Sequence, residues 1–239
     1  MMNKILICNQ KMFLTYDEAI ILNKKIKEID IGDLDVILCP SYLNLNLFPS
    51  FEVGAQDAFY EDKGAYTAEV SAYDLSLRGV KYSLVGHSER KKCDDYNIIN
   101  LKVKAILRNS MIPILCIGET KEEKELHKSL EVLRKQLKYY LKDIKLEDYE
   151  KIYVAYEPRY IIGGKNSLSK EEILDTLKYI KKNLENMGIY NYSLLYGGAV
   201  NSKNINELYS EEIDGFLLGS ASVDVSELEK IIKCIKSVK

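Results

Sequence analysis

The sequence predicts an α/β protein built as a single (β/α)8 barrel, and three observations support this fold class. Eight short apolar runs, rich in β-branched residues, alternate with longer segments of helical period. Strands buried on both faces and separated by helices are typical of a parallel sheet with right-handed crossovers. The length of 239 residues suits such a barrel, which commonly takes about 250 residues as one domain.

The eight runs predict short strands. They lie at Ile5–Cys8, Val36–Cys39, Glu52–Ala55, Tyr82–Val85, Ile112–Cys116, Ile152–Tyr156, Ser193–Tyr196 and Gly215–Leu218. Four of the intervening segments carry an apolar stripe with residues three and four apart, which is typical of a helix packed on a sheet. The stripes are Ala19, Leu22, Ile26 and Ile29; Leu126, Leu130, Leu133 and Leu137; Ile173, Leu177, Ile180 and Leu184; and Leu228, Ile231 and Ile235.

The turn after the first strand, Asn9–Met12, contains no glycine. A doubly wound open sheet usually needs fewer strands and a glycine-rich first turn, so it is the weaker alternative to a closed barrel. No linker or low-complexity stretch divides the chain, and we expect one barrel domain over residues 1–239. In such a barrel, the loops that follow the strands carry the chemistry.

Charge and cysteine usage limit the classes of function. Charged residues make up 29% of the chain with a formal net charge of −2, so nothing draws it electrostatically to nucleic acid or to an anionic membrane. No run approaches the roughly 20 apolar residues of a membrane span. The odd count of five cysteines argues against a disulfide framework, and two distant histidines without a paired-cysteine motif argue against structural zinc. We therefore expect a cytoplasmic protein that holds no metal.

Three polar side chains follow three different predicted strands: Lys11 the first, His87 the fourth and Glu157 the sixth. Taken singly, they have plain interpretations as a solvated charge, a hydrogen-bonded structural histidine and a capping carboxylate. In a barrel, however, all three converge on one face. Such a set can hold an anion, polarise a carbonyl group and remove a proton beside it.

Glycine-rich loops follow the last two strands, as Tyr196–Val200 and Gly219–Ala221. Glycine lets the backbone approach a ligand, and backbone N–H groups at a short helix start favour phosphate. A glycine pair can also make nothing more than a tight turn. Because many barrels build a phosphate site from these two loops, the position of the pair after the seventh strand predicts such a site.

Six motifs resemble those of the triosephosphate isomerase family, in its order and spacing, through essentially the whole chain. They are Asn9-Gln10-Lys11-Met12, Val85-Gly86-His87-Ser88-Glu89-Arg90, Cys116-Ile117-Gly118-Glu119-Thr120, Ala155-Tyr156-Glu157-Pro158, Tyr196-Gly197-Gly198 and Asp214-Gly215-Phe216-Leu217. The motifs around His87 and Glu157 are highly specific, and the others corroborate them. The resemblance implies a TIM barrel, an aldose–ketose isomerase, a small phosphorylated sugar as substrate and no cofactor.

The resemblance also implies roles for individual residues. Glu157 would be the base that moves a proton between neighbouring carbons, and His87 a neutral electrophile that donates to the carbonyl oxygen as an enediolate forms. Lys11 would supply positive charge, and Asn9 would orient the substrate and donate to the developing oxyanion. The implied substrate-binding residues are Gly163, Ala199, Gly219 and Ser220.

Two further segments resemble loops of this family. Pro158–Lys165 corresponds to the closing lid, which keeps water from an enediolate phosphate. Ile162 and Leu217 match the apolar pair that presses on Glu157 when the lid shuts. The stretch around Gln56–Thr67 resembles a loop that inserts into the partner subunit, so the resemblance implies a homodimer.

Several positions near the substrate depart from the family pattern. In the lid, Arg159-Tyr160-Ile161 replaces Val-Trp-Ala, and the lid is one residue shorter before Gly164. Elsewhere, Gln10 replaces a tryptophan, Phe13 an asparagine, Ala199 a serine and Ser220 a glycine. Loss of the serine hydroxyl removes one hydrogen bond to the closed lid, worth about 0.5–1.5 kcal/mol where it matters. The shorter and bulkier lid could instead reshape the pocket for another substrate.

Three functions follow from these observations. The leading one is interconversion of dihydroxyacetone phosphate and D-glyceraldehyde 3-phosphate. The second is a paralogous isomerase of the same mechanism that acts on another small sugar phosphate, such as a tetrulose phosphate, and it would keep the catalytic groups while the lid changes. The third is a barrel that only binds a phosphorylated ligand as a sensor, and such a protein is expected to have lost at least one catalytic group.

Overall fold

The computed structural model describes residues 3–90, 93–147, 150–164 and 167–238, so Lys165 at the end of the expected lid lies outside the described residues. Eight parallel strands form a closed barrel in chain order, as predicted. The strands are β1 (Ile5–Asn9), β2 (Asp35–Cys39), β3 (Glu52–Ala55), β4 (Tyr82–Val85), β5 (Ile112–Ile117), β6 (Ile152–Tyr156), β7 (Tyr192–Tyr196) and β8 (Gly215–Leu218). Their bounds agree with the prediction to within one residue. The doubly wound alternative is wrong, because β8 pairs with β1.

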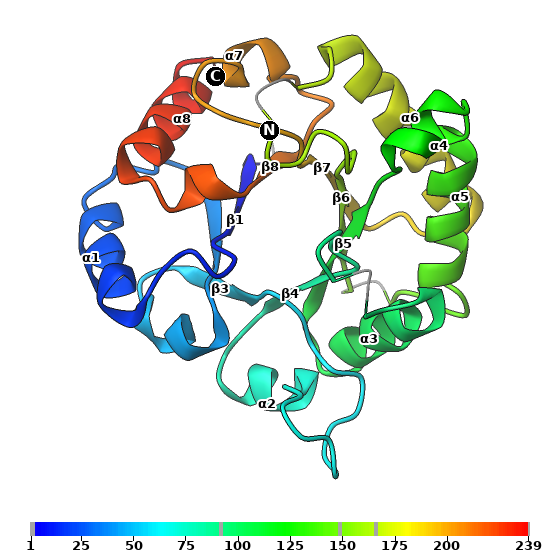
Figure 1. Cartoon of the computed structure of the whole chain (residues 1–239), viewed down its shortest axis with the longest axis horizontal. Helices are drawn as coiled ribbons and strands as arrows, with labels where there is room; N and C mark the ends of the chain where they lie inside the picture. Colours follow the sequence, from blue (N-terminus) through cyan, green and yellow to red (C-terminus); the bar gives the residue numbers. More distant parts are fainter. Residues whose placement is uncertain (1–2, 91–92, 148–149, 165–166, 239) are drawn as a thin grey trace.

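Helices surround the strands as an outer ring (Figure 1). They are α1 (Tyr16–Ile26), α2 (Ala72–Leu77), α3 (Tyr96–Arg108), α4 (Lys121–Glu125), α5 (Ser129–Tyr140), α6 (Lys170–Asn186), α7 (Ile205–Leu208) and α8 (Val225–Val238), with 3-10 turns η1 (Tyr42–Leu47) and η2 (Ser220–Ser222). Capping boxes begin α1, α4 and α6, each pairing a Thr or Ser N-cap with a Glu three residues on. None of the helices in the described ranges is long and apolar enough to cross a membrane.

Alternate residues of each strand face two different layers of the core. Ile5 and Ile7 of β1 pack inside the barrel with Leu217 of β8. Leu6 and Cys8 instead pack in the layer between the strands and the helices. This period of two explains why the strands read as continuous apolar runs, since both faces are buried.

The predicted apolar stripes of α6 and α8 are buried along their whole length. Ala19, Leu22 and Ile26 are likewise buried on α1, while Ile29 lies beyond its end and packs against the core.

The stripe predicted over 126–137 is wrong at its start. Leu126 is 62% exposed and Leu130 47% exposed. His127 has a backbone φ of 55°, which ends the helical path after α4, so α5 begins at Ser129 in a new phase. Leu133 and Leu137 of the predicted stripe are buried as expected, and the helix buries Val132, Gln136 and Tyr140 beside them in place of Leu126 and Leu130.

The segment between β3 and α2, drawn in cyan, extends away from the barrel (Figure 1). Arg108 of α3 ties it down by donating to the Tyr60 carbonyl at 2.6 Å and pairing with Asp62 at 2.8 Å. It contains the stretch around Gln56–Thr67 that, by the resemblance to the family, is expected to reach a partner subunit.

Candidate active site

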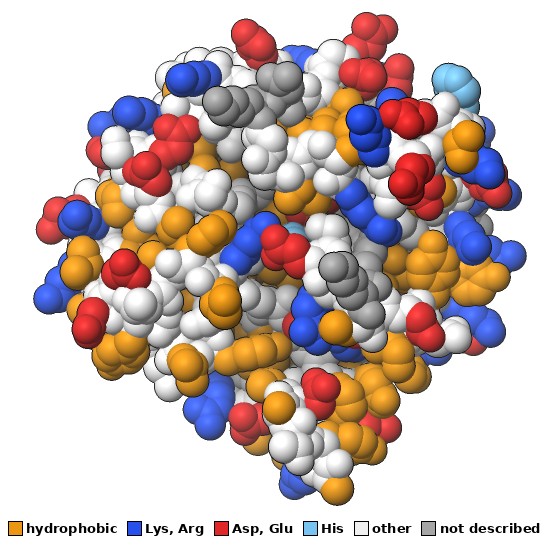
Figure 2. All heavy atoms as spheres, in the orientation of Figure 1, with side chains coloured by type: hydrophobic (Ala, Val, Ile, Leu, Met, Phe, Trp, Pro, Cys, Tyr) orange, Lys and Arg blue, Asp and Glu red, His pale blue; other side chains and the backbone are white. Residues whose placement is uncertain are grey.

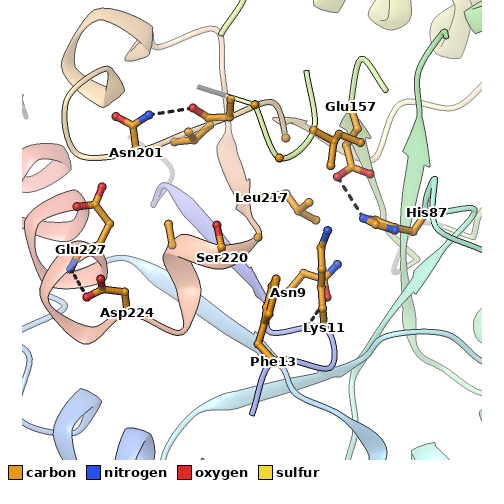
Figure 3. A pocket seen from close by; sticks show the side chains of 18 residues that line it. Asn9, Lys11, Phe13, His87, Glu157, Asn201, Leu217, Ser220, Asp224 and Glu227 are labelled. Atoms are coloured by element: carbon orange, nitrogen blue, oxygen red, sulfur yellow. Dashed lines mark hydrogen bonds and ion pairs between the residues drawn. The ribbon is translucent and has the colours of Figure 1, made fainter. Parts of the chain in front are cut away.

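One cavity of about 400 Å³ opens where the strands end, and its lining includes every site residue expected from the sequence (Figure 3). These residues are Asn9, Lys11, His87, Glu157, Gly163, Ala199, Gly219 and Ser220. Ile162 and Leu217 line it as well. Charged side chains of both signs are intermixed over the face seen in Figure 2.

His87 and Glu157 lie side by side in this cavity although they follow different strands. Nε2 of His87 is 3.6 Å from Oε1 of Glu157 (Figure 3). Both residues are almost fully buried, at 4% and 3% exposure. The surrounding protein therefore shields both side chains from solvent, and a ligand reaches them through the cavity.

The backbone determines which nitrogen of His87 carries the proton. The N–H of Glu89 donates to Nδ1 of His87 at 3.3 Å. A nitrogen that accepts a hydrogen bond cannot also hold a proton, so a neutral ring carries its proton on Nε2. That N–H group is the one that lies beside Glu157.

Glu157 occupies a confined position. An ideal Cβ built on Gly197 would lie 2.7 Å from Cγ of Glu157, so glycine is required for this close approach. On the other side, a Cβ on Gly118 would lie 1.9 Å from the Glu157 carbonyl oxygen. Oε2 of Glu157 is buried and has no hydrogen-bond partner among the described residues.

Lys11 is held in a strained turn after β1. Its φ is 48°, its N–H donates to Oδ1 of Asn9 at 3.1 Å, and its carbonyl accepts from Nε2 of Gln56 at 2.7 Å. Its ammonium group pairs with Oε1 of Glu89 at 2.7 Å. A Cβ built on Gly219 would lie 3.7 Å from Cε of Lys11, so the lysine side chain reaches the loop after β8.

The loops after β7 and β8 offer unoccupied backbone donors. Within the described ranges, no backbone group accepts a hydrogen bond from the N–H of Ala199, Val200, Gly219 or Ser220. All four residues line the cavity. Free N–H groups near a positive side chain make a site for an anion such as phosphate.

The tyrosines that end β6 and β7 each make a hydrogen bond to another segment of the chain. The hydroxyl of Tyr196 accepts from the N–H of Leu168 at 3.3 Å, and burial raises the pKa of Tyr196 to about 12. The hydroxyl of Tyr156 donates to Oε1 of the fully buried Glu119 at 3.1 Å. Burial, and then the charge of Glu119, raise the pKa of Tyr156, so both hydroxyls stay protonated at neutral pH.

Sequence reasoning missed three polar residues of the cavity, namely Asn201, Asp224 and Glu227. Asp224 accepts from the N–H of Glu227 at 3.1 Å at the start of α8, while Glu227 accepts from the N–H of Ser202 at 2.6 Å. The three residues follow the glycine-rich loops closely in the sequence, and this position could have identified them as cavity residues. Across the part of the chain that is described, no cluster of three or more His, Cys, Asp or Glu side chains could hold a metal ion.

Comparison with known proteins agrees with this geometry. A family model described as triosephosphate isomerase matches residues 4–235. A triosephosphate isomerase of Dictyoglomus thermophilum is 35% identical over 98% of this chain and 100% of the relative. Those of Clostridium botulinum and Gloeothece citriformis are 35% and 36% identical, each over 97% of this chain and 99% of the relative. The chain therefore belongs to the triosephosphate isomerase family and is an isomerase.

Proposed function

We propose that this enzyme interconverts dihydroxyacetone phosphate and D-glyceraldehyde 3-phosphate through an enediolate. The observation that carries the proposal is the pairing of Nε2 of His87 with Oε1 of Glu157 at 3.6 Å, while Nδ1 already accepts from Glu89. A hydrogen-bond donor and a carboxylate then face the same small volume. The shared name of the relatives supports a triose phosphate as the substrate.

In this mechanism Glu157 removes a proton from C1 of the ketose, and the electron pair moves toward the carbonyl oxygen at C2. The Nε2–H group of His87 donates to that oxygen, and the ammonium of Lys11 and the amide of Asn9 stabilise its charge. His87 then gives its Nε2 proton to the oxygen at C2 and takes the hydroxyl proton from the oxygen at C1. The electron pair left on that oxygen forms the C1 carbonyl as Glu157 returns its proton to C2, which completes the aldose. A neutral imidazole suits this step because its acidity is closer to that of the enediol than an imidazolium's would be.

The phosphate is assigned to the other end of the cavity, at Gly163, Ala199, Gly219 and Ser220. The free N–H groups after β7 and β8 support this assignment. Phosphate binding there would keep the reacting carbons between His87 and Glu157, which converts binding energy into orientation. The lid segment would exclude water from the enediolate and so prevent loss of the phosphate.

A Glu157→Gln variant tests the assignment of the base. It keeps the size of the side chain but cannot accept the proton, so we expect kcat to fall by at least about 10³-fold in a coupled assay with glyceraldehyde 3-phosphate. Glu125→Gln, an exposed glutamate of α4, is the matched control and should have the wild-type rate. A wild-type rate in Glu157→Gln would show that another group is the base.

A tetrulose phosphate is the second candidate substrate. The altered lid supports it, because the shorter segment with Arg159, Tyr160 and Ile161 would reshape the pocket while the catalytic groups are kept. The same assay with a four-carbon ketose phosphate separates the two. A kcat/KM near about 10⁷–10⁸ M⁻¹s⁻¹ on the triose supports the first candidate, and a higher value on the larger sugar supports the second.

A homodimer through the loop around Gln56–Thr67 is part of the same proposal. A second cavity of about 390 Å³ shares Asn9, Lys11 and His87 with the first and is lined by Gln56, so a partner loop seated there would complete the site. Met12 and Leu43 are 93% and 90% exposed and offer apolar surface for such a contact. Sedimentation of wild type and of Leu43→Asp tests this, and the variant should dissociate.

We also place the enzyme in the cytoplasm and treat residues 1–239 as one barrel domain. All five cysteines are free thiols, which is compatible with a reducing compartment. Limited proteolysis tests the domain assignment, because a single barrel should resist cleavage into stable fragments.

A further inference from the structure

Two asparagines of the loop after β7 converge on one backbone carbonyl. Nδ2 of Asn201 donates to the carbonyl oxygen of Ala199 at 3.2 Å, and Nδ2 of Asn204 donates to the same oxygen at 2.9 Å. Figure 3 shows the bond from Asn201 at the edge of the cavity. Neither asparagine belongs to the residues assigned above to catalysis or to the phosphate.

The orientation of both side-chain amides is determined by the backbone. Oδ1 of Asn201 accepts from the N–H of Lys203 at 2.9 Å, and Oδ1 of Asn204 accepts from the N–H of Asn201 at 2.9 Å. Because each oxygen is committed to a backbone donor, the nitrogen of each amide is the atom that faces the Ala199 carbonyl. All four hydrogen bonds lie within the six residues from Ala199 to Asn204.

This carbonyl belongs to a residue in an unfavourable backbone conformation. Ala199 has a φ of 44°, in the left-handed region that residues other than glycine seldom adopt. The carbonyl of Ala199 and the N–H of Val200 share one peptide plane, so holding the first also directs the second. Both residues line the cavity, and no backbone acceptor in the described ranges uses their N–H groups.

We propose that Asn201 and Asn204 are positioning residues that hold Ala199 in its left-handed conformation, so that the N–H groups of Ala199 and Val200 stay available to the substrate phosphate. The inference rests on the phosphate site of the proposed function. Without the two side-chain donors, the alanine relaxes toward ordinary backbone angles and the loop must reorganise when phosphate binds. Binding weakens for that reason, because a preorganised site avoids this cost.

The test compares Asn204→Asp with Asn206→Asp. Asn204→Asp keeps the oxygen that accepts from the Asn201 N–H but removes the NH₂ group that donates to the Ala199 carbonyl. Asn206→Asp makes the same chemical change at an exposed asparagine of α7. Two constants are measured for each protein: KM for glyceraldehyde 3-phosphate and the inhibition constant of inorganic phosphate. Because the phosphate does not change in the reaction, we expect both constants to rise by about 3- to 10-fold in Asn204→Asp with kcat within about twofold. Asn206→Asp should match wild type.

A second variant separates strain from loss of contact. Adding Ala199→Gly to Asn204→Asp should recover part of the lost phosphate affinity, because glycine adopts a φ of 44° without strain. If Asn204→Asp does not fold, Asn201→Asp makes the same comparison through the bond at 3.2 Å. An inhibition constant equal to that of wild type in the Asp variant overturns the positioning role. A wild-type protein that binds no phosphate overturns the phosphate site instead.

Discussion

Nε2 of His87 lies 3.6 Å from Oε1 of Glu157, although the two side chains follow β4 and β6 on different parts of the barrel. This separation exceeds the roughly 2.7–3.2 Å of a direct N–H···O hydrogen bond. The two side chains are therefore neighbours that make no direct hydrogen bond to each other. A substrate that enters the cavity can contact both at once.

The two histidines of the chain allow a controlled test of this pairing. His87→Asn removes the ring that faces Glu157, and we expect kcat on glyceraldehyde 3-phosphate to fall by about 10²- to 10³-fold while KM changes little. His127→Asn is the control, because His127 is exposed and has a φ of 55°, which asparagine tolerates. Steady-state kinetics that show equal kcat values for the two variants would contradict the role of His87.

Gly197 tests how tightly Glu157 must be placed. An alanine Cβ there would lie 2.7 Å from Cγ of Glu157, so the carboxylate must move. A displacement of about 1 Å should lower kcat by about 10²-fold.

The control is Gly188→Ala, whose Cβ meets nothing within 4 Å but whose φ of 76° strains an alanine. It should lose stability and keep its kcat, measured by thermal unfolding and by steady-state kinetics. Wild-type kcat in Gly197→Ala would show that this contact does not confine the base.

Two buried glutamines should respond in opposite ways to the same substitution. Neither amide atom of Gln10 has a hydrogen-bond partner among the described residues, whereas Gln136 accepts from the N–H of Gly118 at 2.9 Å and donates to its carbonyl at 3.0 Å. We expect Gln10→Met to raise the free energy of unfolding by about 1–2 kcal/mol, since it removes an unsatisfied buried amide. Gln136→Met should lower it by about 2–4 kcal/mol, because two backbone groups lose their partners.

Urea denaturation of both variants measures the two changes. Each glutamine serves as the control for the other, since both are almost fully buried, at 2% and 0% exposure. A loss of stability in Gln10→Met would show that the buried amide finds a partner in solution.

The start of α6, directly after the lid, should be sensitive to acid. The Ser169 hydroxyl donates to Oε2 of Glu172 at 2.9 Å, and this bond is the main cause that lowers the pKa of Glu172 below its ordinary value of 4.5. A carboxyl group with a lowered pKa in the folded state stabilises the protein above its unfolded pKa. That contribution is lost as the pH falls through the folded pKa, so the sensitive range lies below 4.5.

Ser169→Ala removes the N-cap and should lower the free energy of unfolding by about 1 kcal/mol at neutral pH. The difference from wild type should shrink as the pH falls below 4.5, because wild type then loses the same contribution. Urea unfolding over this range measures it, with Ser226→Ala inside the first turn of α8 as the control. A difference that stays constant with pH would show that the cap acts without Glu172.

The strands could be predicted because both of their faces are buried, which makes each one a short continuous apolar run. The prediction of the stripe at 126–137 is correct at Leu133 and Leu137 and wrong at Leu126 and Leu130. Its phase depends on the φ of His127, and no periodicity of apolar residues reports a single backbone angle. Lys11, His87 and Glu157 and the loops after β7 and β8 stand out because they follow apolar runs directly, whereas the roles of single substrate-binding residues come only from the resemblance to the family.

The sequence by itself determined the positions and order of the eight strands and which polar side chains stand at their ends. These are local properties of composition and period. Only the tertiary structure decided that β8 closes on β1, that His87 lies 3.6 Å from Glu157, and that two asparagines meet at the Ala199 carbonyl. Each of these depends on distances between separate segments or on individual backbone angles, which packing sets and local propensity does not.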